Sequence, residues 1–174
     1  MVREFPELQG VMGSYYARHH GLSHDVADAI SGHYAPRGPG ESLPCGPLAR
    51  LLALCDRLDT LVGFFSAGIR PTGSKDPFAL RRTALGIIRL LENVGDVIPM
   101  QLFAKSFSGY TDGDLMDPIE DVHTFMLDRL RVYWQGQGMR ADIIAAALDT
   151  GGYSDSIPAL KKRIESVQEF IKGP

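Results

Sequence analysis

The sequence has 174 residues, a formal net charge of -3 and 44% hydrophobic residues. This composition supports a packed core and excludes a disordered chain. The slightly acidic balance excludes a global basic field, so any contact with nucleic acid must come from a local patch. No apolar run reaches the length of a membrane span, and we expect no membrane partner. Two cysteines in neutral settings, Cys45 and Cys55, indicate a reduced, cytoplasmic protein without a disulfide.

Helical periodicity dominates the chain, and no segment shows sustained period-two alternation. Pro47 suits the first turn of a long helix, and "DTGGYSD" is a stop and turn before the last helix. We therefore predict an all-α fold with roughly eight helices. Seven segments carry the pattern: 8–19, 24 or 25 to 34, 47–65, 77–94, 117–134, 140–150 and 157–171.

The stretch "PTGSKDPFALRR", residues 71–82, combines turn residues with basic residues. Its spacing does not match a P-loop, which needs two glycines separated by four residues. The sequence predicts that Asp76 caps a helix whose first position is Pro77. Lys75, Arg81 and Arg82 then form a compact basic patch beside helix amides that favour anions. A phosphate contact and a solvated helix face both fit these arginines.

His33 and two carboxylates form the other notable group. Asp56 and Asp59 lie three residues apart in "LCDRLDTL", on one face of an apolar helix. A carboxylate within such a helix needs a partner, which Arg57 or Arg50 could supply. A metal shared by His33 and Asp56 is the alternative.

Three stretches carry a resemblance to a known family. "EFPELQGVMGSYYA", "HYAPRGPGESLP" and "CDRLDTLVGFFSAGIRPTGSKDPFALRRTALGIIRLL" resemble the beta subunit of the bacterial glycyl-tRNA synthetase built from two alpha and two beta chains. The resemblance is dense over residues 1–95 and looser from Asp114 onward. Beta chains of that family are far longer, so we expect an internal fragment that stops before the family's anticodon-binding domain.

The resemblance also implies a domain organisation. Residues 1–107 correspond to a helical domain related to the HD phosphohydrolases, truncated at its start, and residues 108–174 to additional helices of a body segment. His33 and Asp56 match metal-binding positions of HD proteins, but Tyr34 replaces a second histidine and the His-Asp doublet would precede Met1. We therefore expect His33, Asp56 and Asp59 to be vestigial, without a metal, and to pair with arginine or to make hydrogen bonds in the helix core.

For function, the resemblance implies ATP- and Mg²⁺-dependent attachment of glycine to tRNA by the whole enzyme, with the alpha subunit performing the adenylate chemistry. We expect this chain to be a noncatalytic module, without a cofactor of its own, that handles tRNA(Gly) and assembles with the alpha subunit and a second beta subunit. Five basic residues are candidates for tRNA contact: Lys75, Arg81, Arg82, Arg37 and Arg70.

Three further interpretations remain open. Tyr15 and Tyr16 could stack on a splayed base, although packing in the core is the favoured role. The chain could be a metal-dependent HD-type phosphohydrolase. It could also be purely architectural, with the apolar face of "PFALRRTALGIIRLL" docked on a partner chain.

Overall fold

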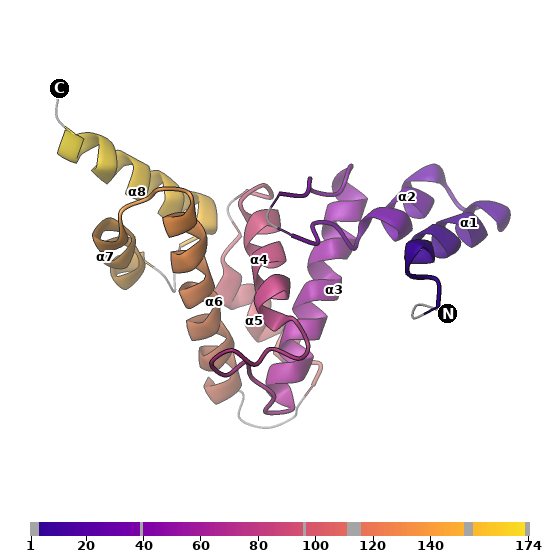
Figure 1. The fold of residues 1–174 in the computed structure, drawn as a ribbon, viewed down its shortest axis with the longest axis horizontal. Helices are drawn as coiled ribbons and strands as arrows, with labels where there is room; N and C mark the ends of the chain where they lie inside the picture. The colour runs from indigo at the N-terminus through magenta and orange to yellow at the C-terminus, as the bar shows by residue number, and fades with distance from the viewer. Residues whose placement is uncertain (1–3, 39, 96, 111–115, 152–154, 173–174) are drawn as a thin grey trace. The chain divides into compact units, whose positions relative to one another are not determined.

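The computed structural model describes residues 4–38, 40–95, 97–110, 116–151 and 155–172. Within these ranges the fold consists of α-helices and one short 3-10 helix, with no β-strand, which confirms the all-α prediction (Figure 1). The elements are η1 (Pro6–Leu8), α1 (Val11–His19), α2 (His24–Gly32), α3 (Pro47–Ser66), α4 (Leu80–Leu91), α5 (Pro99–Phe107), α6 (Met116–Gly136), α7 (Ala141–Gly151) and α8 (Ile157–Lys172). No helix in the described ranges is long and apolar enough to cross a membrane.

The chain divides into two compact units, Met1–Arg57 and Leu58–Pro174, with the boundary inside α3. This division follows from contacts within the chain. The division at residue 107 that the resemblance implies concerns family domains, and it stays a prediction.

In the first unit, α1 and α2 pack against each other as a hairpin (Figure 1). Glycine permits the close approach, because a Cβ on Gly13 would lie only 2.7 Å from the Ile30 side chain. The Ser23 side chain accepts a hydrogen bond from the Val26 amide at 3.4 Å and so caps the start of α2. The hairpin is therefore fixed both by small residues at its crossing and by a capped turn.

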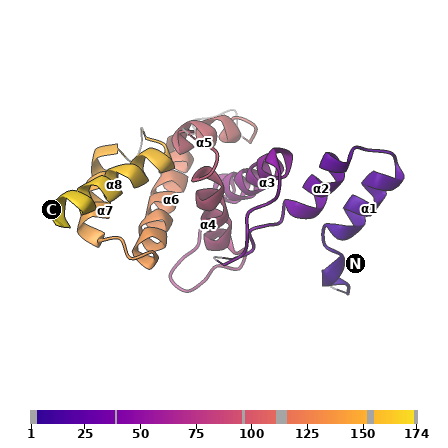
Figure 2. The ribbon, with the colours of Figure 1, turned by 90° about the horizontal axis from the view of Figure 1, so that it is seen from above.

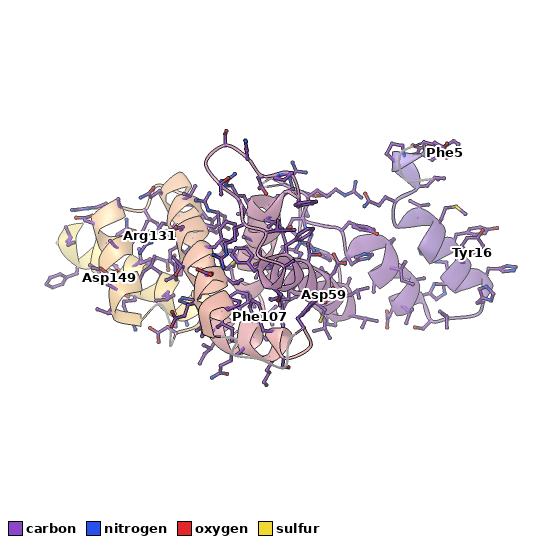
Figure 3. The ribbon with its side chains drawn as sticks, turned by 90° about the horizontal axis from the view of Figure 1, so that it is seen from below. Phe5, Tyr16, Asp59, Phe107, Arg131 and Asp149 are labelled. Atoms are coloured by element: carbon purple, nitrogen blue, oxygen red, sulfur yellow. The ribbon has the colours of Figure 1, made fainter. Side chains whose placement is uncertain are left out.

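In the second unit, α6 packs against α4, α5 and α7, and α8 contacts both α4 and α7 (Figure 2). The core of this unit contains Trp134, Phe103 and Phe107, whose side chains are fully buried. Figure 3 shows Phe107 among the helices of this unit. Burial of such large apolar side chains is the main term that stabilises a helical unit of this size.

The apolar face of α4 belongs to this core. Its apolar residues recur every three or four positions, as expected for one side of a helix. Five large side chains on this side are 0–1% exposed: Leu80, Ile87, Ile88, Leu90 and Leu91. This face packs inside the chain, against α6 and α8. This part of the face is therefore not open to a partner chain, and a purely architectural role for the chain stays a prediction.

The seven predicted segments all become helices. The sequence reasoning did not name α5, and it placed the start of α4 at Pro77 rather than at Leu80. Cys45 and Cys55 are free, as expected.

Candidate nucleic-acid interface

The α3–α4 connection contains a tight hairpin between Thr72 and Lys75. The Thr72 amide donates to the Lys75 carbonyl at 3.1 Å, and the Lys75 amide donates back to Thr72 at 2.8 Å. Gly73 takes a positive φ of 50°, which suits a residue without a Cβ. The Arg81 guanidinium donates to the Gly73 carbonyl at 2.6 Å. Arg81 therefore supports the loop itself.

Asp76 organises the start of α4. Its carboxylate oxygens accept hydrogen bonds from the backbone amides of Leu80, at 2.8 Å, and Arg81, at 3.0 Å. The predicted cap is thus confirmed, but Pro77 is not the first helical residue. Ala79, in the left-handed region at φ 55°, is inserted before Leu80. Because a carboxylate already occupies these amides, a phosphate would have to be bound by side chains at this helix start.

Two of the basic residues of this loop and of the first turn of α4 remain available for an anion. Lys75 and Arg82 are exposed, and neither side chain forms an ion pair with any residue in the described part of the chain. Arg70, by contrast, forms an ion pair with Asp121 of α6. The structure therefore separates the four cations of the loop and of the first turn of α4 into two that hold the fold and two that face solvent.

An exposed aromatic ring lies in the same loop. Phe78 is 48% exposed and stacks on Phe64 of α3, with ring centroids 4.3 Å apart. Packing on Phe64 thus fixes one face of the Phe78 ring, while much of the ring is exposed to solvent. Aromatic side chains of this kind stack on unpaired bases in RNA complexes.

The fifth candidate, Arg37, belongs to the first unit. It is exposed in the α2–α3 connection, and its backbone amide donates to the Glu41 carboxylate. Its side chain has the exposure that a phosphate contact requires.

The positions suggested for a metal site do not form one. The Nδ1 atom of His33 lies 2.9 Å from the Ile30 carbonyl oxygen, and the imidazole ring packs on Tyr34 at 4.0 Å. Asp56 is exposed, and Asp59 accepts a hydrogen bond from the Tyr110 hydroxyl. In the described ranges, no group of three His, Cys, Asp or Glu side chains could hold a metal ion. These residues do not fit the metal centre of an HD enzyme.

The arginines near these carboxylates have other partners. Arg50 donates from Nε to the Pro44 carbonyl at 3.0 Å. Arg57 is 8% exposed and donates to four backbone carbonyls, at 2.8–3.2 Å: those of His33, Tyr34, Pro36 and Ala53. Neither arginine forms an ion pair with Asp56 or Asp59 in the described part of the chain, while Asp59 accepts the hydrogen bond from Tyr110. The vestigial role expected of these carboxylates stays a prediction.

Burial lowers the pKa of the Arg57 guanidinium from its ordinary value, while the charges of Asp56 and Glu41 oppose that effect. The sequence analysis missed this structural role. The available signal was an arginine on the same helical face as Ala49 and Ala53, which are both buried.

The two adjacent tyrosines of α1 also differ from expectation. Tyr15 is 63% exposed and Tyr16 is 55% exposed, so their predicted packing in the core is wrong. Figure 3 shows Tyr16 on α1. Their rings meet edge to face, with centroids 6.1 Å apart. The alternative role, stacking on a base, stays a prediction.

Comparison with known proteins decides the family. A sequence model described as "Glycyl-tRNA synthetase beta subunit" matches residues 1–149. The chain belongs to this family. It is 46% identical to the glycine–tRNA ligase beta subunit of Ruegeria sp. (strain TM1040) over 174 residues, which is 99% of this chain and 24% of that relative. It is 44% identical over 177 residues to the corresponding subunit of Thiobacillus denitrificans, covering all of this chain and 25% of the relative.

The chain thus spans about a quarter of the length of the curated relatives it matches. The relatives are beta subunits of a ligase that joins glycine and tRNA, as their names state. Family membership confirms the resemblance found in the sequence.

Proposed function

We propose that this chain is a noncatalytic, tRNA-handling module of a glycine–tRNA ligase beta subunit. The whole enzyme attaches glycine to tRNA(Gly) in the cytoplasm, uses ATP and Mg²⁺, and assembles from alpha and beta subunits. In this proposal the residues of this chain hold the RNA and help brace the assembly. The reacting groups of glycine and ATP are bound elsewhere in the enzyme.

The observation that carries the proposal is the pair of exposed cations at the α3–α4 loop (Lys75) and the first turn of α4 (Arg82). Lys75 and Arg82 lack ion-pair partners among the described residues, and the loop and helix start that bear them are fixed by Asp76 and Arg81. Phosphate contacts need positive charge held at a convergent place, and they supply most of the sequence-independent affinity for RNA. A fixed loop limits the side-chain ordering that binding requires.

The decisive experiment is a titration of the chain with tRNA(Gly) at several salt concentrations. We expect Lys75→Ala and Arg82→Ala each to weaken binding and to lower the slope of log K against log salt by about 0.7–0.9, the value for one phosphate contact. Lys162→Ala, which removes an exposed cation of α8, is the matched control and should leave the slope unchanged.

The double variant K75A/R82A should lose about twice the slope of either single variant, because the two contacts are separate. If both variants bind tRNA(Gly) with the slope of the unchanged chain, the loop does not contact phosphate. The proposed interface would then be wrong, whatever the activity of the whole enzyme.

A further inference from the structure

The first half of α3 has an open, leucine-rich side. Leu48, Leu51 and Leu52 are 42%, 58% and 37% exposed, and Cys55 is exposed as well. Their spacing of three, four and seven residues places all four on one side of the helix. We call these four residues the leucine face.

The opposite side of the same stretch is packed. Ala49 and Ala53 are 3% and 0% exposed, and Leu54 is 6% exposed. This part of α3 therefore has apolar residues on two opposite sides, and only one of these sides is covered by the rest of the chain. Covering leucine side chains removes apolar surface from water, so the open side is a strong candidate for a contact.

The spacing of the leucine face specifies the kind of partner. Residues at i, i+3, i+4 and i+7 form the seam along which one helix packs on another. An extended peptide would instead need a sheet edge with free backbone groups, and the described residues form no sheet. The surface therefore fits an amphipathic helix.

Charges around the leucine face specify the flanks of that helix. A cavity of about 470 Å³ adjoins Leu48, and its wall includes the carboxylates of Asp25 and Asp28. Asp28 is partly compensated by Arg18, at 2.7 Å, whereas Asp56 follows Cys55 at the other end of the face. Both ends of the surface thus present carboxylates, which complement Lys or Arg side chains.

We propose that the leucine face is the docking surface for an amphipathic helix with basic flanks, supplied by the part of the family's polypeptide outside this chain. The relatives are about four times as long as the matched region, so about three-quarters of their polypeptide is available to provide it. Connection within one polypeptide gives such a helix a high effective concentration at this surface. This inference is independent of the proposed tRNA contact.

Cys55 provides the test, because its thiol lies within the leucine face. We would measure alkylation of Cys55, resolved by mass spectrometry of its peptide, in this chain and in a chimera. The chimera is the Ruegeria beta subunit with this chain in place of the matching quarter. We expect alkylation of Cys55 to be slowed about tenfold or more in the chimera, since the thiol reacts only after the docked helix opens.

A cysteine placed on exposed Asp149 of α7 (Asp149→Cys) serves as the matched control and should react at similar rates in both proteins. In the chimera, Leu51→Glu should restore the reactivity of Cys55, whereas Leu51→Met should not. Because Leu51 is largely exposed, neither change should lower the melting temperature of the chain alone.

Three results would overturn the proposal. Equal alkylation of Cys55 in the chain and the chimera would mean that nothing in the longer polypeptide covers the face. Protection that rises with the concentration of the chain alone would assign the face to a second copy. Protection of the chain alone on addition of tRNA(Gly) would assign it to RNA.

Discussion

Arg57 is the residue on which the connection from α2 to α3 depends. One buried guanidinium of α3 satisfies three carbonyls at the start of that connection, those of His33, Tyr34 and Pro36. Five N–H donors in a planar fork allow arginine to serve several diverging carbonyls at once. Burial is thus tolerated because both terminal nitrogens, Nη1 and Nη2, donate to two carbonyls each.

We predict that Arg57→Met destabilises the chain by about 3 kcal/mol, because methionine fills the space but leaves buried carbonyl oxygens without a donor. Urea unfolding followed by circular dichroism measures this loss. Arg50→Met, which removes one hydrogen bond to Pro44, is the control and should cost about 1 kcal/mol. Equal costs for the two variants would contradict the role assigned to Arg57.

Tyr133 makes the free energy of unfolding of the chain depend on pH in the alkaline range. Burial, followed by its hydrogen bond to Glu92 at 2.9 Å, raises the pKa of the Tyr133 hydroxyl above its ordinary value. The folded chain then holds this proton more tightly than the unfolded chain, so the stabilisation is complete below about pH 10 and declines as pH rises through the folded-state pKa.

We therefore predict that the free energy of unfolding falls as the pH rises above about 10, and that Tyr133→Phe flattens this decline. Denaturant unfolding at a series of alkaline pH values measures it. Tyr110, whose pKa is raised chiefly by its hydrogen bond to Asp59, should contribute in the same direction. An unchanged profile in a Tyr133→Phe, Tyr110→Phe double variant would show that other groups control alkaline stability.

At the scale of elements, the start of α4 carries both a cap and a strained residue. Ala79 holds a φ of 55°, a left-handed conformation that costs an L-residue with a Cβ roughly 1 kcal/mol. We predict that Ala79→Gly raises the free energy of unfolding by about 0.5–1 kcal/mol, because glycine adopts this conformation without that penalty. Thermal unfolding measures the change.

The neighbouring Asp76→Ala should act in the opposite direction, with a loss of about 1 kcal/mol from the amides of Leu80 and Arg81. If Ala79→Gly lowered stability while Asp76→Ala did so as well, the backbone conformation at residue 79 would have to differ from the one described.

The helix α4 shows which features the sequence could predict and which feature it could not. The apolar period from Leu80 to Leu91 was enough to find α4, and the dipeptide Asp76-Pro77 was enough to find the cap. The left-handed Ala79 could not be foreseen, because alanine has no intrinsic preference for that region. Its conformation is imposed by the surrounding hydrogen bonds, which shift the start of the helix by three residues.

For the whole molecule, contacts between distant segments decide which functional candidates remain. Arg70 and Asp121 are unremarkable in the sequence, yet their ion pair removes Arg70 from the set of unpaired cations. The exposure of Tyr15 and Tyr16 likewise depends on which side of α1 faces α2. A pattern in one segment predicts its own helix, but it carries no information on such pairings.

Glu92 connects three helices of the second unit. Its carboxylate accepts hydrogen bonds from Tyr133 and from the Trp134 indole, at 3.2 Å, and lies 3.4 Å from the Lys161 ammonium of α8. We predict that Glu92→Ala costs about 3 kcal/mol, because the buried Trp134 indole, the half-buried Tyr133 hydroxyl and a cation lose their acceptor. Fluorescence of Trp134, the one tryptophan in the sequence, reports the unfolding directly.

Asp128→Ala is the control for that measurement, since it removes an exposed ion pair with Arg131. Such pairs contribute about 0–1 kcal/mol. A similar cost for both variants would mean that Glu92 does not connect the helices.

Gly63 lies close to the side chain of Tyr110, so the residues at these two positions constrain each other during evolution. A Cβ at position 63 would lie 3.1 Å from the Tyr110 hydroxyl oxygen, so alanine there would press on the ring and loosen its hydrogen bond to Asp59. Among diverging relatives, a larger residue at position 63 should therefore occur together with a smaller side chain at position 110. Exchange of one without the other is the change that selection is expected to remove.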